Sequence, residues 1–236
     1  MFRKLLTLLI PLLLLPLPAR AGEAVSAFVE RIVAAYGGAE ALSDPSAVRQ
    51  SGHTVSTMRG GETGALMRVF QGSDRLRVEI GYPGEAPEVR VLDGRRGWTK
   101  GVEATGPMTG AMQLQAARMA LPRILLEHKA RVMDQGMTKG PDGADIRVLE
   151  LPLSPHTVLF VGADKATGLI HFSSGVMKFG GGQGMEFATI YSDFKDWNGR
   201  LFAGREEQYA MGQHTGYNVI DKVELLESVG AETFRP

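Results

Sequence analysis

The residues that could hold a metal ion are spread widely along the chain. The five histidines are His53, His128, His156, His171 and His214, and no two of them lie three to five positions apart. Zinc motifs place paired ligands at about that spacing, so the sequence has no usual zinc pattern. A metal site assembled from distant strands stays open, but scattered strand or surface histidines are favoured. The chain also has no cysteine, which excludes disulfides, thiolate chemistry and cysteine ligands.

Patterns for covalent or phosphate chemistry are absent as well. No Gly-x-Ser-x-Gly elbow occurs, so no serine can be assigned to a catalytic triad. The glycine-rich run at 180–184 lacks the Gly-Lys-Ser/Thr context of a phosphate loop and is expected to connect two strands. Asp193 and Asp196 could form an acid/base pair, but beside Asn198-Gly199 they are expected to be turn formers. We therefore expect no enzymatic activity, no metal and no cofactor.

The stretch from Thr189 to Phe202 gives the clearest structural signal. Asn198-Gly199 predicts a two-residue turn between two strands, because both residues tolerate the positive φ angles of such a turn. Large apolar side chains surround the turn, and the hairpin must therefore pack against either a core or an apolar ligand. These side chains are Tyr191, Phe194, Trp197, Leu201 and Phe202.

Residues 1–21 have the three regions of a secretory signal peptide. A basic start at Arg3-Lys4 precedes an apolar run over 5–17 and the small residues around Ala19-Arg20-Ala21. We predict cleavage after Ala21, which leaves 22–236 as a single domain long enough to bury a sizeable core. The alternative is an uncleaved membrane anchor, but the apolar run is shorter than the roughly 20 residues that cross a bilayer and is interrupted by prolines.

The charges of the chain are balanced. The full sequence has 26 basic and 26 acidic residues, and removal of residues 1–21 leaves a net charge of about −3. Such a mixed, nearly neutral surface argues against nucleic acid as a partner and against a polybasic membrane patch. No second apolar run of spanning length follows, so we expect a soluble, exported protein.

The rest of the sequence predicts a mainly β protein with a few helices. Residues 26–42 have apolar side chains at helical spacing and Ser26 as a candidate N-cap, so they predict one core helix, weakened at Gly37-Gly38. From Val48 onward, short runs alternate with turn residues, as in an antiparallel meander of about ten strands. The predicted strands are 48–58, 65–70, 75–82, 88–92, a run towards Trp98, 132–133, 146–151, 157–161, 169–172, 185–191, the hairpin continuing to Tyr209, and 216–226.

Residues 108–131 interrupt these strands with helix-forming residues. The segment is apolar on more than one side, and Pro122 is expected to split or kink it. Met108, Met112 and Met119 give it an adaptable apolar surface of the kind that accepts variable shapes. On this pattern alone, a buried helix with methionines filling gaps is favoured over a ligand surface.

Several short stretches together resemble the LolA/LolB-like superfamily of periplasmic lipoprotein-localisation proteins, and most closely its outer-membrane lipoprotein-sorting-like members. Similar stretches accompany some pitrilysin-type zinc peptidases, whose zinc-ligand motif this chain lacks. The stretches are Ala35-Tyr36-Gly37-Gly38-Ala39-Glu40-Ala41-Leu42, Val48-Arg49-Gln50-Ser51-Gly52, Ser73-Asp74-Arg75-Leu76-Arg77-Val78-Glu79, Leu92-Asp93-Gly94 with Gly97-Trp98, and Tyr191-Ser192-Asp193-Phe194 with Asn198-Gly199 and Leu201.

The resemblance implies an α+β fold in which a curved antiparallel half-barrel of about eleven strands has helices covering its concave face. In that family the cavity receives acyl chains, and the covering helices act as a lid. Because no cysteine stands at the cleavage site, the chain resembles the soluble periplasmic carrier rather than the membrane-anchored acceptor. Inner- or outer-membrane handover proteins are then candidate partners.

We therefore expect a periplasmic carrier or chaperone that binds a lipid or lipoprotein acyl chain in an apolar cavity for envelope transport. The alternative is an envelope sensor or protein-interaction module whose own helices fill the cavity. An enzyme acting on a lipid is least favoured, because no nucleophile and base can be paired. The candidate ligand contacts are Met108, Met112, Leu114, Met119, Leu121, Leu125 and Leu126 in the lid, and Leu76, Val78, Ile80, Phe187, Tyr191 and Trp197 in the sheet.

Overall fold

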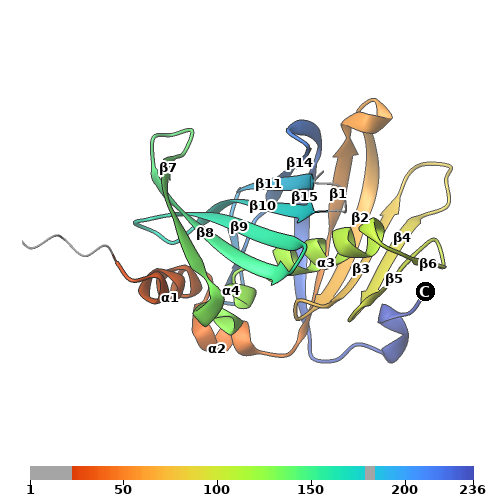
Figure 1. The fold of residues 1–236 in the computed structure, drawn as a ribbon. Coiled ribbons are helices and arrows are strands. Elements are labelled where there is room, and N and C mark those ends of the chain that lie inside the picture. Colours follow the sequence, from red (N-terminus) through yellow and green to blue (C-terminus); the bar gives the residue numbers. More distant parts are fainter. Residues whose placement is uncertain (1–22, 179–183) are drawn as a thin grey trace, which may run out of the picture.

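The computed structural model describes residues 23–178 and 184–236. The predicted signal peptide and the glycine-rich residues 180–183 lie outside these described residues. The described part forms a large curved antiparallel sheet that does not close on itself, with helices inside and beside the curve (Figure 1). This arrangement confirms the predicted mainly β half-barrel with helices on its concave side.

The main sheet has 13 strands in the order β6-β5-β4-β3-β2-β1-β15-β14-β11-β10-β9-β8-β7. The first and last strands of the chain, β1 and β15, pair at its centre and join two arms. The strands are β1 Ala47–Ser56, β2 Glu62–Gln71, β3 Arg75–Gly81, β4 Glu88–Asp93, β5 Arg96–Thr99, β6 Val102–Ala104, β7 Met133–Lys139, β8 Asp145–Ser154, β9 Thr157–Asp164, β10 Ile170–Lys178, β11 Gly184–Ser192, β14 Arg205–Ala210 and β15 Gln213–Leu226.

The sequence pattern predicted too few strand residues at the two edges of this sheet. It did not predict β6, and it gave only two residues, 132–133, to the region that continues as β7. Every residue of β7 is exposed, and two of the three residues of β6 are exposed. Neither strand buries a face, so the apolar alternation that marks a half-buried strand is missing from both. The sheet consequently has two strands more than the resemblance implied.

Two helices cross the concave side of the sheet. The chain has to pass from β6 at one edge to β7 at the other, and it does so through α3 (Pro107–Met119) and α4 (Arg123–Glu127), which separate at Pro122 as predicted. Pro107 stands in the first turn of α3, where a missing N–H costs nothing. The 13 residues of α3 span roughly 20 Å, so this helix lies inside the curve between the two arms (Figure 1).

Glycines in the sheet allow α3 to approach both arms closely. A Cβ on Gly175 in β10 would lie 2.3 Å from the Cδ atoms of Leu114, and a Cβ on Gly97 in β5 would lie 2.8 Å from the sulfur of Met112. Leu114 belongs to the core cluster between the helices and the arm of β8 to β10, whereas Met112 belongs to the cluster against β1 to β4. The helix is therefore fixed from both sides.

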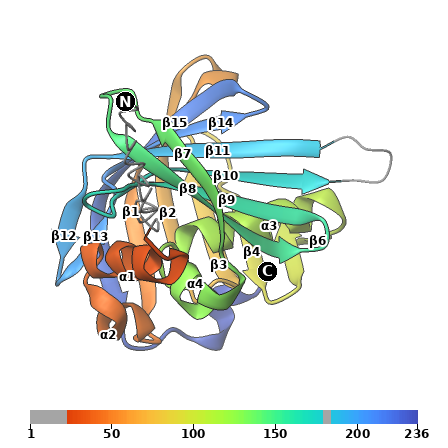
Figure 2. The ribbon, with the colours of Figure 1, turned by 60° about the vertical axis from the view of Figure 1, so that its left-hand side comes forward.

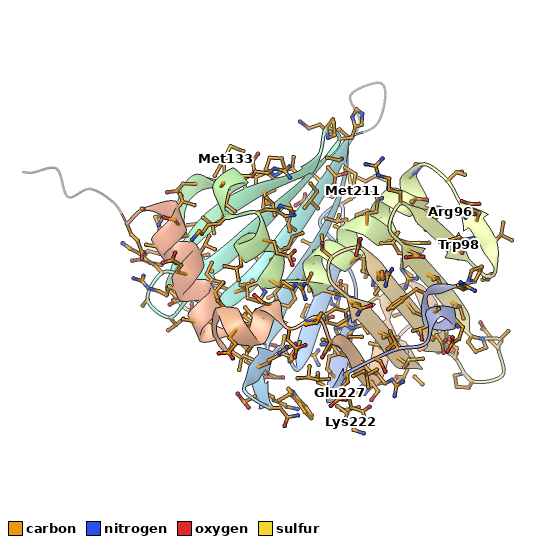
Figure 3. All side chains as sticks on the ribbon, turned by 90° about the horizontal axis from the view of Figure 1, so that it is seen from below. Arg96, Trp98, Met133, Met211, Lys222 and Glu227 are labelled. Carbon is orange, nitrogen blue, oxygen red and sulfur yellow. The ribbon has the colours of Figure 1, made fainter. Side chains whose placement is uncertain are left out.

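The N-terminal segment forms two helices rather than the single predicted helix. α1 (Val25–Ala35) and α2 (Gly38–Ser43) separate at Gly37, whose φ of 109° ends the helical path. α1 begins without a side-chain cap, so Ser26 is not the predicted N-cap. With α4, these helices gather at one open end of the half-barrel (Figure 2), and α1 lies over the arm that contains β8 and β9 (Figure 3).

The predicted turn at Asn198-Gly199 is confirmed, with φ angles of 55° and 79°. It joins β12 (Lys195–Trp197) and β13 (Arg200–Phe202), which form a separate two-stranded sheet instead of extending the main one. Its apolar side chains pack into the core: Phe194 and Leu201 join one cluster, while Trp197 and Phe202 join the other. The hairpin is thus part of the packed interior.

Short 3₁₀ turns complete the described fold at η1 (Thr57–Arg59), η2 (Lys129–Arg131) and η3 (Ala231–Phe234). Phe234 is buried against Val69 and Val91, on the convex side of the β1–β6 arm. Arg96 lies over the ring of Trp98 at the edge of this arm (Figure 3). Within residues 23–178 and 184–236, we find no helix with the length and apolar character needed to span a membrane.

Candidate ligand-binding cavity

A cavity of about 400 Å³ lies between α3 and the concave face of the sheet. Its walls come from one face of α3, from η1, and from seven strands: β1 to β4, β11, β14 and β15. Cavities that enclose small ligands typically have volumes of roughly 300–1,000 Å³. The helices therefore fill the half-barrel only in part.

One stripe of α3 faces this cavity. Ala111, Leu114, Gln115, Arg118 and Met119 line it, and their spacing of three and four residues is that of a single helical face. Met112, Ala116 and Ala117 on other sides of the helix are buried in the core. The helix thus presents both apolar and polar groups to the open space.

The strands contribute alternate residues, because successive side chains point to opposite faces of a sheet. Val78 and Ile80 of β3 line the cavity, and so do Phe187 and Tyr191 of β11. Arg75 at the start of β3 is exposed. Leu76 and Val78 are buried, so buried residues alternate with more exposed ones over the first part of this strand.

A buried ion pair forms part of the cavity wall. Arg68 of β2 donates from Nη1 to Glu206 Oε2 of β14 at 2.9 Å, with a second bond from Nη2 to Oε1. The Arg68 Nε donates to Gln50 Oε1 at 2.6 Å, and Asn218 Nδ2 donates to Glu206 Oε2 at 3.0 Å. The pair therefore links strands from both arms across the centre of the sheet.

The ionised state of Glu206 depends on these partners. Burial alone would raise the pKa of the Glu206 carboxyl, but the Arg68 charge and the hydrogen bonds from Arg68 and Asn218 outweigh it. The pKa of Glu206 is therefore below its ordinary value. Glu206 is a carboxylate at neutral pH, and Arg68 neutralises it.

A second arginine approaches the same group from the helix. Arg118 Nη1 donates to the backbone oxygen of Phe187 at 3.2 Å. Tyr191, which is hydrogen-bonded to Ser173 through the two hydroxyls at 2.8 Å, lies within electrostatic reach of Arg118. Burial raises the pKa of the Tyr191 phenol, so this hydroxyl stays protonated.

The charged cluster also borders a smaller hollow of about 50 Å³. Arg68, Arg118, Met119, Tyr191 and Glu206 line both spaces. The smaller hollow continues toward the apolar side chains of the β12–β13 hairpin. Polar groups in the wall are thus flanked by apolar surface, an arrangement suited to an amphiphilic ligand.

Six of the thirteen candidate contacts line the main cavity. They are Leu114, Met119, Val78, Ile80, Phe187 and Tyr191. They come from α3, β3 and β11, which the fold brings together around one space.

The other seven candidates lie elsewhere. Met112, Leu125 and Leu76 are fully buried in the core, and Leu126 and Trp197 pack against it. Met108 is exposed at the start of α3. Leu121 lines the hollow of about 50 Å³ and a further one of about 40 Å³ that Arg123 of α4 also borders. The helical candidates were misplaced because α3 and α4 bury one side in the core. In the sequence both sides of these helices are equally apolar, so the buried side could not be told from the cavity side.

Charged lining residues, among them Arg68, Arg90, Arg118 and Glu206, were not among the candidates. Arg118 had a visible signal, since it is a lone charge in the apolar segment 110–121. The other three come from strands in which charged residues also face outward, and only the pairing of the strands shows which of them face the cavity.

Two of the histidines and Asp196 contact other groups of the protein. His214 contacts Glu207 at 2.7 Å and His53 contacts Asp221 at 3.5 Å, each at a partly exposed position. Asp196 accepts a hydrogen bond from the Gly199 amide at 3.0 Å, as expected of a turn former. In the described ranges, no three His, Asp or Glu side chains gather in a way that could hold a metal ion.

Three solved structures have a similar fold. A LolA superfamily protein from Nitrosomonas europaea matches with a TM-score of 0.56 at 14% identity, over 90% of this chain and 97% of that one. A domain from Vibrio parahaemolyticus whose suggested role is outer-membrane lipoprotein sorting gives 0.55 at 11% identity, over 89% and 95%. A DUF1329 family protein from Desulfovibrio piger gives 0.56 at 11% identity, over 89% and 97%.

These likenesses show that the chain has the LolA-like half-barrel fold, which the sequence stretches resembled. At such low identities the likeness concerns the fold alone. A search with protein-family models and a search of curated proteins give no match to the sequence.

Proposed function

We propose that this protein is a non-enzymatic periplasmic carrier that binds the acyl chain of a lipid or lipoprotein in the cavity under α3. The observation that carries the proposal is the open space of about 400 Å³ inside a fold that its helices cover but do not fill. Two proteins with the same fold are a LolA superfamily protein and a domain with a suggested role in lipoprotein sorting, and this supports the same class of cargo.

The apolar part of the wall provides the binding free energy. Leu66, Val78, Ile80, Leu114 and Phe187 line the cavity. Each methylene that leaves water for such a surface contributes about 0.8 kcal/mol. A partly enclosed chain could therefore bind usefully while its remaining surface stays available for transfer.

The rim of the cavity suggests where a chain enters. Met58 of η1 lines the opening and is 83% exposed. Met211, in the turn between β14 and β15, is also exposed and lies at the surface (Figure 3). Thr57 Oγ1 donates to the His214 backbone oxygen, which ties η1 to the beginning of β15. Handover proteins of the inner or outer membrane are the partners we propose for this end.

Native mass spectrometry of the protein purified from the periplasm of producing cells, followed by solvent extraction, tests the proposal. We expect a stoichiometric lipid or acylated species that leaves on extraction. Ala111→Trp places an indole in the cavity, because Ala111 lies on the cavity face of α3, and this variant should lose most of the cargo. Ala27→Trp, on the exposed side of α1, is the matched control and should keep it.

Two results would count against the carrier. A protein that carries no lipid, and whose mass stays the same when lipids are supplied, would instead favour the sensor or interaction module. Equal loading of the Ala111→Trp and Ala27→Trp variants, both folded by thermal unfolding, would show that any bound lipid lies outside this cavity.

A further inference from the structure

The register of the sheet places two arginines on the cavity wall. Gln50 of β1 faces Arg68 of β2, Arg68 faces Val78 of β3, and Val78 faces Arg90 of β4. Directly opposed residues point to the same side of a sheet, so this row lies on the concave face. Arg68 and Arg90 are two strands apart, which separates their backbones by roughly 10 Å.

The charges around the cavity do not cancel. Three arginines and two glutamates line it. Glu206 is already bound by Arg68, and it also accepts from Asn218 and from Gln208. The other lining glutamate, Glu88, lies 3.6 Å from Arg59, an arginine that does not line the cavity. The wall therefore has one positive charge in excess.

Arg118 and Arg90 are the two lining arginines other than Arg68, and Glu88 on the strand of Arg90 attracts the Arg90 charge. Neither guanidinium has an ion-pair partner within the part of the chain that the structure describes, and the one hydrogen bond of Arg118 goes to a backbone oxygen. No described side chain has a buried polar atom without a hydrogen-bond partner. The remaining N–H groups of both arginines must therefore face open space, and the space that they line is the cavity.

Burial makes these free donors costly. It lowers the pKa of both the Arg118 and the Arg90 guanidinium, although arginine stays charged at any physiological pH. A guanidinium that has lost much of its water gains most from an anion that presents two oxygens to its planar donors. Carboxylates and phosphates have that geometry.

We propose that Arg118 binds the anionic head group of the cargo, with Arg90 on another wall adding to the positive field, and that the cargo is an amphiphile with one acyl chain and a carboxylate or phosphate head. The inference rests on the proposed function, because it names the ligand class of the same cavity. A volume of about 400 Å³, near the lower end for ligand pockets, suits a single chain. The chain then lies on the apolar wall beside Val78 and Phe187.

Calorimetric titration with probes that share one twelve-carbon chain separates the head group from the tail. The probes are dodecanoate, dodecyl phosphate and the neutral dodecanol, each below its micelle concentration. We expect the wild-type protein to bind both anions roughly tenfold or more tightly than dodecanol, since charge-assisted hydrogen bonds are the stronger class. Arg118→Gln should remove this preference by weakening the binding of both anions far more than that of dodecanol.

Two further variants complete the set. Arg90→Gln should lose a smaller part of the preference, since Arg90 acts through the field. Arg49→Gln is the matched control, because Arg49 is exposed on β1 next to buried Gln50 and therefore faces away from the cavity. For each variant, binding of the neutral probe dodecanol shows that the apolar cavity is still formed.

The outcomes distinguish this inference from the carrier proposal. Equal affinity of the wild-type protein for dodecanol and dodecanoate would refute the anion subsite and leave the carrier standing. No binding of any probe would refute both. If inorganic phosphate alone bound as tightly as dodecyl phosphate, and Arg118→Gln removed both, the site would take a free anion and the amphiphile would be wrong.

Discussion

A methyl group at position 175 should disturb the contact between α3 and the sheet. A Cβ on Gly175 would lie 2.3 Å from Cδ1 and Cδ2 of Leu114 and 2.7 Å from its Cγ. Leu114 is 1% exposed, so either its side chain leaves its packed position toward the cavity that it also lines, or the helix shifts. Overpacking of this kind costs about 1–3 kcal/mol, and we expect Gly175→Ala to lower the free energy of unfolding by that amount.

A double-mutant cycle isolates this contact. Leu114→Ala alone should cost about 2–5 kcal/mol, because it leaves a cavity in the core. In the double variant the new methyl at position 175 enters the vacated space. The stability loss of the double variant should therefore be smaller than the sum of the two single losses by about 0.5–3 kcal/mol. Urea unfolding measures all four proteins, and their m-values should agree if only the native state has changed.

Gly81→Ala is the matched control for this cycle. Gly81 ends β3, and an added Cβ there would meet no atom within 4 Å, so the exchange should not destabilise the protein. Losses at Gly175 and Leu114 that add within about 0.5 kcal/mol would refute the reasoning. A Gly175→Ala variant as stable as Gly81→Ala would do the same, because α3 would then not rest on β10 through this contact.

Two further substitutions test the interior of the half-barrel. Glu206→Gln should lower the free energy of unfolding by about 3–5 kcal/mol at neutral pH, because Arg68 then lies buried without its counter-charge. The lowered pKa of Glu206 stabilises the fold above the ordinary carboxyl pKa of 4.5, and this stabilisation is lost as the pH falls through the folded-state value. The difference between wild type and variant should therefore shrink below that pH in chemical unfolding, and a constant difference would contradict the assignment. Tyr36→Phe should cost about 1–3 kcal/mol in the same assay, since it removes the acceptor of the buried Ile170 N–H at 3.0 Å. An unchanged unfolding midpoint would show that this hydrogen bond contributes nothing net.

Local chemistry is the part of the fold that could be read from the sequence. Asn198-Gly199 forms its turn because both residues accept positive φ wherever the hairpin lies. Pro122 separates α3 from α4 because proline cannot donate the helical hydrogen bond. Gly37 separates α1 from α2 because glycine accepts the positive φ found there. The sequence predicted only a weakened helix at this point, since glycine permits a break but tertiary contacts decide whether it occurs.

The edge strands of the sheet were harder to predict than its interior strands. Interior strands such as β3 alternate apolar and charged residues, with Leu76 and Val78 buried and Arg75 exposed, and this pattern was sufficient to predict them. β6 and β7 bury no face, and their hydrogen bonds to β5 and β8 alone define them. Backbone pairing leaves no periodic mark in side-chain type, which is why the edges were missed.

The sequence by itself determined the class of the fold, the turn at Asn198-Gly199, the break at Pro122 and the absence of the usual metal and nucleophile motifs. Only the tertiary structure decided that Arg118 faces an open cavity while Met112, on the same helix, is buried. The physical reason is that α3 is apolar on both sides. The rotation of this helix about its own axis therefore depends on Gly175 and Gly97, where the missing Cβ atoms let Leu114 and Met112 approach the sheet. Those glycines come from opposite arms of the sheet, and the pairing of β1 with β15 joins the two arms.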